Sequence, residues 1–407
     1  MARLPSFIHI LLFLLFTYFT RAYTTLSDET LKVLPDAGND FDIKEGKLLA
    51  PILRPRVPGS PGSTYVLKHF VDFFKTSLPK WNIAFQNSTS KTPATGDKDI
   101  PFVNLIVSRD PPWTTPGEVG RLTLVAHYDS KLNPAGFIGA TDSAAPCAML
   151  MHAARSVDSA LTKKWEHMQA EGVGNGGFLG IEEQKGIQII FMDGEEAFVN
   201  WDNNDSIYGA KALAIELEAT PHPALSTYHN ALSSISLFLL LDLLGEKNPN
   251  VPSWFKTTHW AYRNMATLEN RLRSQSLFFS STEHPRNTGD HQRSKRADSP
   301  FLPEAEKAEN NQWSGVKMED DHLPFMERGV EILHVIPYPY PRAWHNLDDD
   351  GEHLDLDTVK DWATLTTAFV GEWMDLEGFF EAKTTEAPPR RGIDKNMGQI
   401  VTSKTEL

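Results

Sequence analysis

The sequence predicts a three-layer α/β/α fold built around a central mixed, mostly parallel sheet. Short apolar runs rich in β-branched residues alternate with segments whose apolar residues recur at helical spacing, a pattern typical of βαβ units. Acidic and histidine side chains follow several of these runs, and ligands of open α/β sheets bind beyond the carboxyl ends of the strands. With 407 residues, 41% of them hydrophobic, the chain can form one large domain or two ordinary ones.

The chain divides into a predicted signal peptide at 1–22, an extended lead-in at 23–60, a single catalytic domain at 61–380 and a disordered tail at 381–407. The signal peptide is indicated by Arg3, by an apolar run at 7–19 and by small residues around a cleavage site at Ala22. The apolar run is short for a bilayer, so a retained membrane anchor is the weaker alternative.

Charge and cysteine content narrow the class of protein. A formal net charge of -14 without a basic patch argues against a nucleic-acid partner. Cys147 is the only cysteine, so no intramolecular disulfide can form, and the core and any bound metal must stabilise the fold. Acceptor sequons begin at Asn87 and Asn204. We therefore expect a secreted, glycosylated monomer with no stable membrane association after signal cleavage.

Helical spacing of apolar residues predicts a short helix at 28–33 in the lead-in and five helices in the catalytic domain. In the first of the five, Val66, Phe70 and Phe74 recur every fourth residue, and the second is rich in Ala, Met and Leu. Asp357 is expected to cap the last one. The five predicted helices span 64–78, 146–169, 206–218, 257–277 and 358–376.

Apolar runs bounded by turn residues predict six strands. The run at 187–192 is β-branched and follows a glycine, and the run at 234–245 carries a single charge, Asp242. The predicted strands span 83–85, 102–107, 122–126, 187–192, 234–245 and 332–336. Polar, turn-rich segments predict loops at 86–98, 171–186 and 280–315, the last of them long, exposed and mobile.

The segment Gly186–Trp201 is the centre of the predicted chemistry. Its apolar strand ends in Asp193, Glu195 and Glu196, and three carboxylates so close together are costly to bury without a cation. Adjacent residues of an extended chain point in opposite directions, so one glutamate could bind a metal while the other transfers protons. The alternative interpretation is a solvated acidic turn after a core strand.

Further candidates are scattered along the chain: His127, Asp129, Asp142, Asp242, Asp320, Asp321, His322, His334 and His345. Imidazole and carboxylate groups together suit zinc, which takes three protein ligands and keeps one open position in catalytic sites. Each candidate also has a structural interpretation: a helix cap for Asp142, a buried hydrogen bond for Asp242, a satisfied core group for His334, an ordinary loop histidine for His345, and core packing for Trp201 and Trp344.

Several motifs in order resemble the glutaminyl-peptide cyclotransferase family, the glutaminyl cyclases. They include HYDSK at 127–131, GATDSA at 139–144, FMDGEEAF at 191–198, EDDHLPF at 319–325 and the segment from HVIP to WH at 334–345. The resemblance covers about residues 60–377. That family has the zinc aminopeptidase-like fold, which agrees with the predicted layers.

The resemblance implies that the chain cyclises the N-terminal glutamine of peptides or proteins to pyroglutamate and releases ammonia. It implies one catalytic zinc ion held by Asp142, Glu196 and His345, with Glu195 as general acid and base. The other implied site residues are Asp242 and Asp320, as a carboxylate network beside Glu195, and Trp201, Trp344, His334, Glu319 and Tyr340 at the substrate.

Two positions depart from the family pattern, and one backbone feature is expected from it. Secreted animal members carry a cysteine at the position of Ala126, paired with the one matching Cys147, so Cys147 is expected to be a free, buried thiol here. Glu319 stands where those relatives have glutamine, which adds a negative charge beside the substrate. The Asp142–Ser143 peptide bond is expected to be cis.

The main rival is a secreted aminopeptidase with two zinc ions. Aminopeptidases of this fold use residues equivalent to His127, Asp142, Glu196, Asp242 and His345, and all five residue types are present. The motifs around Trp201, at 319–322 and before His345 favour cyclisation instead. A noncatalytic secreted binding protein on the same scaffold is a third possibility, which the retention of every candidate catalytic residue disfavours.

Overall fold

The computed structural model describes residues 24–173, 184–287, 299–308, 310–311, 313 and 318–381. Within these residues one mixed sheet has the strand order β1-β2-β4-β3-β5-β6. The strands are β1 (Asn82–Lys91), β2 (Asp99–Arg109), β3 (Val119–His127), β4 (Gln184–Met192), β5 (Ile235–Leu241) and β6 (Ile332–Val335). Strands β3, β4, β5 and β6 are parallel to one another. At one edge β2 pairs with β4 and β1 pairs with β2, both in the antiparallel direction. The predicted mostly parallel sheet is therefore confirmed.

Alternate residues of the central strands face two separate cores. Leu124 and Ile189 point into the larger core, while their neighbours Val125 and Ile190 point into the smaller one. Because both faces are covered, these strands are nearly continuous apolar runs, as parallel strands usually are.

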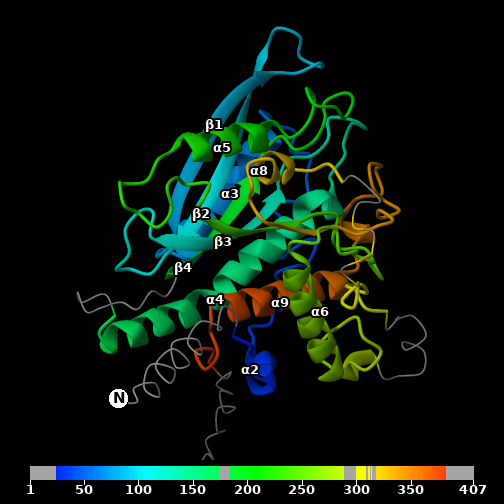
Figure 1. Cartoon of the computed structure of the whole chain (residues 1–407). Helices are drawn as coiled ribbons and strands as arrows, with labels where there is room; N and C mark the ends of the chain where they lie inside the picture. Colours follow the sequence, from blue (N-terminus) through cyan, green and yellow to red (C-terminus); the bar gives the residue numbers. More distant parts are fainter. Residues whose placement is uncertain are drawn as a thin grey trace, which may run out of the picture.

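Helices form the outer layers on both faces (Figure 1). The larger core is covered by α3 (Pro61–Ser77), α4 (Ala145–Ala170), α6 (His259–Ser274) and α9 (Leu356–Trp373), and the smaller by α5 (Tyr208–Ala219) and the short α8 (Leu323–Met326). In Figure 1, α4 and α9 run side by side below the sheet, and α5 and α8 lie close together on its other face. This arrangement confirms the three-layer fold.

The lead-in is part of the larger core. Its helix α2 (Asp28–Val33) has the predicted bounds and begins after Ser27, whose side chain accepts a hydrogen bond from the Thr30 amide at 3.1 Å. Leu26 and Phe41 on either side of this helix are fully buried. Residues 24–60 therefore pack against the domain as an integral segment.

The first strand is longer than predicted. β1 continues to Lys91 and pairs with β2 along its whole length, so the prediction of a loop from residue 86 was wrong. Its side chains are mostly polar, and its backbone hydrogen bonds rather than an apolar face keep it in the sheet. Such a strand has no apolar pattern to detect.

Two further predictions were wrong in detail. Asp355, not Asp357, caps α9 and accepts a hydrogen bond from the Thr358 amide at 2.8 Å. Within 280–315, Phe301 and Leu302 are 2% exposed, because their amides donate to the Glu269 carboxylate and their side chains pack into the core. The described part of this segment is thus anchored at Phe301 and Leu302, while several of its other residues are exposed as predicted.

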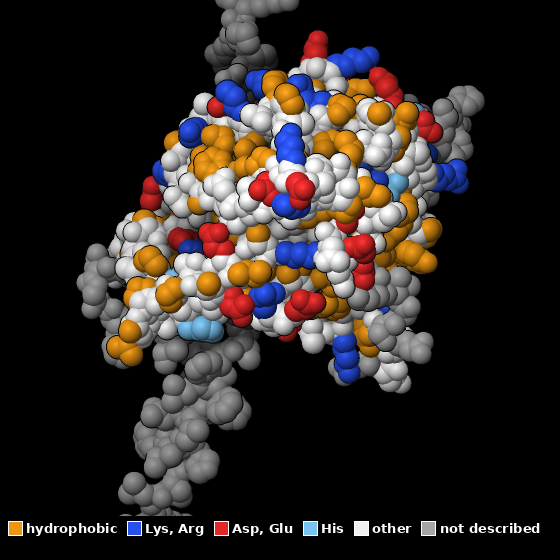
Figure 2. Space-filling model, turned by 90° about the horizontal axis from the view of Figure 1, so that it is seen from above, with side chains coloured by type: hydrophobic (Ala, Val, Ile, Leu, Met, Phe, Trp, Pro, Cys, Tyr) orange, Lys and Arg blue, Asp and Glu red, His pale blue; other side chains and the backbone are white. Residues whose placement is uncertain are grey.

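Within the described residues, no helix combines the length and the apolar character that crossing a membrane requires. The predicted signal peptide, the tail from residue 382 and the centre of the 171–186 loop lie outside the described residues. On the face shown in Figure 2, acidic, basic and hydrophobic side chains are interspersed.

Candidate active site

Parallel strands bring the candidate side chains to one edge of the sheet. β3 ends at His127, which lies beside Met192 at the end of β4, and β5 ends at Leu241 in the next strand position. Glu195 and Asp242 therefore follow β4 and β5, the two strands that flank β3, and lie at the same edge of the sheet, as the sequence pattern predicted.

Asp129 fixes the backbone of the glutamate pair. Its fully buried carboxylate accepts hydrogen bonds from the amides of Glu195 at 3.1 Å and Glu196 at 3.2 Å. Its Oδ1 also lies 3.3 Å from Nδ1 of His127. Although burial alone would raise it, these contacts hold the pKa of Asp129 below its usual range.

The two glutamates have different surroundings. Glu195 lines a cavity, whereas Glu196 accepts a hydrogen bond from Nζ of Lys131 at 3.1 Å and lies 3.7 Å from Nε2 of His345. Burial raises the pKa of Glu195 well above its usual range, and the carboxyl groups of Glu196 and Asp320 raise it further. Such a group holds a proton more readily than an exposed glutamate does, as a general acid must.

Asp142 lies in a distorted turn before α4. The turn η1 (Ala140–Ala144) has non-helical dihedral angles at Asp142, and the Asp142–Ser143 peptide bond is cis, as expected. The cap position of α4 is held by Ala144, so the interpretation of Asp142 as its cap is wrong. Asp142 Oδ1 instead lies 3.0 Å from His127 Nε2, and its buried Oδ2 has no hydrogen-bond partner within the described residues.

Asp142, Glu196 and His345 form a group that could hold a metal ion. Nε2 of His345 lies 3.5 Å from Asp142 Oδ2 and 3.7 Å from Glu196 Oε2. Two ligand atoms of a tetrahedral zinc ion, each about 2.0–2.2 Å from it, are roughly 3.3–3.6 Å apart. The first separation falls within that range and the second lies just above it, and within the described residues Asp142 Oδ2 and Glu196 Oε1 have no hydrogen-bond partner. Burial lowers the pKa of His345 to about 4, so its imidazole is neutral, as a ligand must be.

His127, Asp142 and Asp242 form a second such group. Nε2 of His127 lies 3.0 Å from Asp142 and 3.4 Å from Asp242, and Ser143 Oγ donates a hydrogen bond to Asp242. Although burial would lower it, the carboxylates of Asp129, Asp142 and Asp242 raise the pKa of His127 well above its usual range. In this group the imidazole is hydrogen-bonded to its acidic neighbours.

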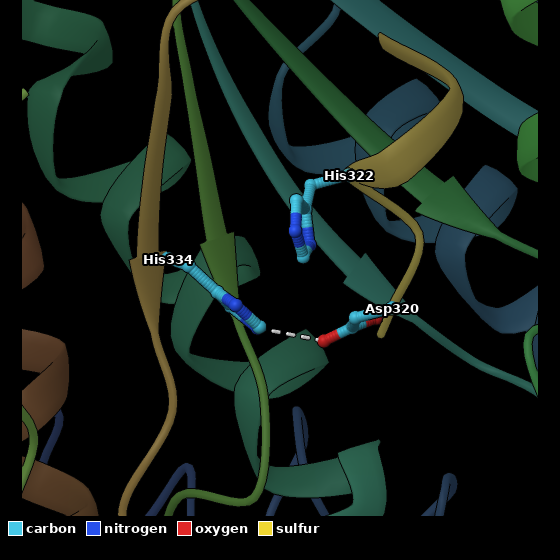
Figure 3. A group of neighbouring side chains, drawn as sticks. All are labelled: Asp320, His322 and His334. Carbon is cyan, nitrogen blue, oxygen red and sulfur yellow. Dashed lines mark hydrogen bonds and ion pairs between the residues drawn. The ribbon is translucent and has the colours of Figure 1, made fainter. Parts of the chain in front are cut away.

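Asp320, His322 and His334 form a third, buried group (Figure 3). Figure 3 shows the ring of His334 pointing at Asp320, with His322 to one side. His334 Nε2 and Asp320 Oδ2 are 2.7 Å apart, a hydrogen-bond distance and shorter than the roughly 3.3 Å between two ligands of one zinc ion. We therefore interpret Asp320 and His334 as a buried hydrogen-bonded pair, beside which neither ring nitrogen of His322 has a hydrogen-bond partner within the described residues.

A cavity of about 460 Å³ adjoins the first two groups. Of the residues predicted to contact substrate, Trp201, Glu319, Tyr340 and Trp344 line it, together with Lys131, Asp142, Glu195, Asp242 and His345. His334 and Asp320 do not line it, and their side chains are buried. They can reach the cavity only through their neighbours.

Aromatic side chains form one wall of the cavity. Trp344 stacks on His345, with ring centroids 3.9 Å apart, and Tyr340 packs against Trp344 at 4.4 Å. Trp201 also lines the cavity and donates a hydrogen bond from Nε1 to Glu319 Oε2 at 3.0 Å. The wall thus combines flat apolar rings with a single carboxylate.

A family model and several known proteins match most of the chain. The model of peptidase family M28 matches residues 104–370. A glutaminyl-peptide cyclotransferase-like protein of Bos taurus is 36% identical over 332 residues, which cover 81% of this chain and 74% of that protein. The glutaminyl-peptide cyclotransferase of Bothrops jararaca is 35% identical over 335 residues, or 81% and 80% of the two chains.

The chain belongs to the glutaminyl-peptide cyclotransferase family, within peptidase family M28. The crystal structure of Macrostomum lignano glutaminyl cyclase has the same fold, with a TM-score of 0.65 and 24% identity over 88% of this chain and 94% of that one. The family resemblance inferred from the motifs is therefore confirmed.

Cys147 distinguishes this member of the cyclotransferase family from the pattern expected of secreted animal relatives. It is a fully buried free thiol, as predicted, and Sγ donates to the carbonyl oxygen of His127 at 3.1 Å. Ala126 lies beside Phe191 in the sheet and is also fully buried. Burial raises the pKa of Cys147 to about 12, so the thiol is protonated and unreactive at neutral pH.

The sequence alone did not assign a role to Lys131 or Arg56, two residues that contact the residues of this site. Lys131 contacts Glu196 and lines the cavity. Its position as the last residue of the HYDSK motif was the signal in the sequence that could have identified it. Arg56, in the lead-in, donates to the backbone around Asp142 and carries no local signal in the sequence.

Proposed function

We propose that this enzyme cyclises the N-terminal glutamine of peptides and proteins to pyroglutamate, with release of ammonia. The observation that carries the proposal is that the adjacent residues Glu195 and Glu196 have different surroundings. Glu195 lines the cavity, while Glu196 belongs to the group with Asp142 and His345. A proton-transferring carboxylate thus stands beside a set of metal ligands, in a chain whose relatives are cyclotransferases.

Zinc is the metal we propose, and Asp142, Glu196 and His345 would hold it. Two carboxylates and one neutral imidazole are a donor set that zinc accepts, and their separations suit tetrahedral coordination. A bound zinc ion would supply Lewis-acid polarisation of the γ-carboxamide and stabilise the negative charge that develops on its oxygen. We propose one such ion per chain.

The chain's own residues would move the proton. Glu195 accepts a proton from the α-amine as the amine nitrogen attacks the γ-carboxamide carbon and the five-membered ring closes. The bond between that carbon and the amide nitrogen then breaks, and Glu195 returns the proton to the departing ammonia. The reaction consumes no water. Glu195 is only 6% exposed, and its burial favours ring closure over hydrolysis because it limits the access of water.

Asp242 and Asp320 would keep Glu195 in the protonation state that the reaction requires. Both carboxylates are buried at the same edge, and Asp320 is held by His334 at 2.7 Å. Burial raises the pKa of Asp320, and Asp242 raises it further. We propose that this network shares protons with Glu195, and that His334 acts through Asp320.

The aromatic wall would hold the glutamine side chain. Trp201 and Trp344 offer flat surfaces to its methylene groups, and Tyr340 supports Trp344 at 4.4 Å. Glu319 places a carboxylate beside the position of the substrate's amine or of the residues that follow it.

An aminopeptidase with two zinc ions is the second candidate, and the His127, Asp142 and Asp242 group is the observation that favours it. The decisive experiment incubates purified residues 23–407 with a short peptide that begins with glutamine. Cyclisation releases ammonia and leaves a peptide about 17 Da lighter, whereas an aminopeptidase releases free glutamine and a shorter peptide. Zinc content by elemental analysis checks the number of ions, for which we expect one.

We also propose that the chain enters the secretory pathway, is glycosylated and acts as a monomer. Asn87 and Asn204, the two sequon asparagines, are both exposed. Expression of the full chain in animal cells should place it in the medium with a mass that falls on treatment with a glycosidase. Retention in the cell membrane would favour the alternative of an uncleaved anchor.

A further inference from the structure

Arg56 has an unusual environment for a charged side chain. It is fully buried, and within the described residues its guanidinium group forms no ion pair with a carboxylate. Burying an unpaired cation is costly, so such a residue is retained only where other contacts compensate. Burial lowers the pKa of Arg56, and the nearby negative groups of Asp129, Asp142 and Asp349 partly offset this effect.

The guanidinium group of Arg56 instead binds backbone carbonyls of two segments of the site. Nε donates to Tyr128, which follows β3, and the terminal nitrogens donate to Ile138, to Gly139 at 2.9 Å and to Asp142 at 3.4 Å. One planar group thus joins the end of β3 to the start and to the middle of the turn that carries Asp142. A fork of fixed donors is suited to this task, whereas the single ammonium group of lysine is not.

The same turn is held from a second direction by Asp349. One oxygen of its carboxylate accepts hydrogen bonds from the Thr141 amide at 2.7 Å and the Thr141 hydroxyl at 2.9 Å. Its backbone carbonyl accepts from the Ala140 amide at 3.0 Å. Asp349 follows His345 in the same loop, so the segments that carry two of the proposed ligands are tied together.

We propose that Arg56 is a positioning residue that orients Asp142 and thereby sets the metal affinity of the site. It touches neither the cavity nor the three proposed ligand side chains. It fixes the carbonyls of Gly139 and Asp142, and Asp349 fixes the amides of Ala140 and Thr141 between them. The inference rests on the proposed role of Asp142 as a metal ligand.

The test measures zinc affinity without substrate, by competition with a chelating dye, for the wild-type chain and for Arg56→Lys and Arg56→Met. We expect both variants to bind zinc about 10- to 100-fold more weakly, the range found when groups that orient metal ligands are removed. Arg56→Lys keeps the charge but not the fork, so an equal loss in both variants assigns the effect to geometry.

Arg109→Met is the matched control. Arg109 is also a buried arginine, 5% exposed and paired with Asp158, but it lies in β2 beside Ile187, at the opposite end of β4 from the site. We expect it to lower the melting temperature and to leave zinc affinity within about threefold of wild type. Asp349→Asn provides a second test on a residue that supports the same turn, should Arg56→Met not fold.

The outcomes separate the inference from the function on which it rests. If wild type binds zinc and Arg56→Lys, Arg56→Met and Asp349→Asn bind it equally well, Arg56 only stabilises the fold and the inference is overturned. If the wild-type chain itself binds no zinc, the ligand assignment, and with it the proposed function, is wrong.

Discussion

Trp201 donates a hydrogen bond from Nε1 to Oε2 of Glu319 across 3.0 Å, and both side chains line the cavity. The indole therefore holds a carboxylate against the aromatic wall. Because a bound peptide would bring its N-terminal amine into this cavity, we expect the carboxylate to affect which peptides that begin with glutamine are preferred.

The variant Glu319→Gln should change which peptides are preferred. Its side-chain carbonyl can still accept the Trp201 hydrogen bond, so only the charge is lost. We expect kcat/KM for peptides with lysine in the second position to fall, and for those with glutamate there to rise, each by about 2- to 5-fold, because a partly exposed charge contributes roughly 0.5–1 kcal/mol. The measurement is kcat and KM on a matched set of Gln-Lys, Gln-Ala and Gln-Glu peptides.

A control separates charge from position in that experiment. Trp201→Phe removes the hydrogen bond but keeps the carboxylate, so it should weaken all three peptides alike. An equal effect of Glu319→Gln on all three peptides would contradict a role for its charge in selectivity.

Glu195→Gln should keep the metal and lose the reaction. The amide fills the same space but cannot accept the amine proton, so we expect kcat to fall by about 10²- to 10⁴-fold. Its neighbour Glu196→Gln is the contrasting variant, because Glu196 belongs to the proposed ligand group, and it should lose zinc. Zinc content and ammonia release are measured on the same samples. Loss of zinc from Glu195→Gln would make Glu195 a ligand and reverse the two roles.

Removal of the metal should destabilise the fold. Asp142 Oδ2 and Glu196 Oε1 have no hydrogen-bond partner within the described residues, so a chelator would leave buried carboxylates uncompensated. Free zinc at 100 times its Kd stabilises a site that only the folded chain offers by about 2.7 kcal/mol. We expect the melting temperature to fall by several degrees on chelation and to recover with zinc. Asp142→Asn should show neither change, and an unaltered melting temperature in wild type would argue against a metal in this group.

His152 should make the fold less stable in acid. It is fully buried in α4, with Nε2 3.2 Å from Ser156 Oγ, and burial lowers its pKa to about 4. Because the unfolded chain binds this proton from about pH 6.5, the free energy of unfolding decreases as pH falls from 6.5 to 4, by about 1.4 kcal/mol per pH unit.

The variant His152→Gln removes that titration. The difference in unfolding free energy between the variant and wild type, measured by urea denaturation from pH 4 to 7.5, should therefore shift in favour of the variant as pH falls. Parallel profiles over this range would show that His152 does not titrate in the way its burial predicts.

Much of the fold was predictable because its signals are local. The apolar runs that form β3, β4 and β5 are buried on both faces, so their composition alone identifies them, and the residues that follow them necessarily meet at one edge. The edge strand β1 was underestimated because partners on β2, rather than its own side chains, decide its length.

The supporting contacts of the site were not predictable for a related reason. Asp129 holds the amides of Glu195 and Glu196, and Arg56 holds carbonyls far along the chain. Backbone partners leave no mark on the sequence, since any residue supplies an amide or a carbonyl. Phe301 and Leu302 show the same limit, because Glu269 anchors their amides within a segment of polar composition.

The buried thiol of Cys147 has a practical consequence. The chain contains one cysteine, which is buried in α4 with its Sγ on the carbonyl oxygen at the end of β3, so correct folding requires no oxidant and no disulfide exchange. The polypeptide should consequently reach the same active conformation in the reducing cytosol of a bacterial production host as in an oxidising compartment, and reductants in the storage buffer should leave it intact.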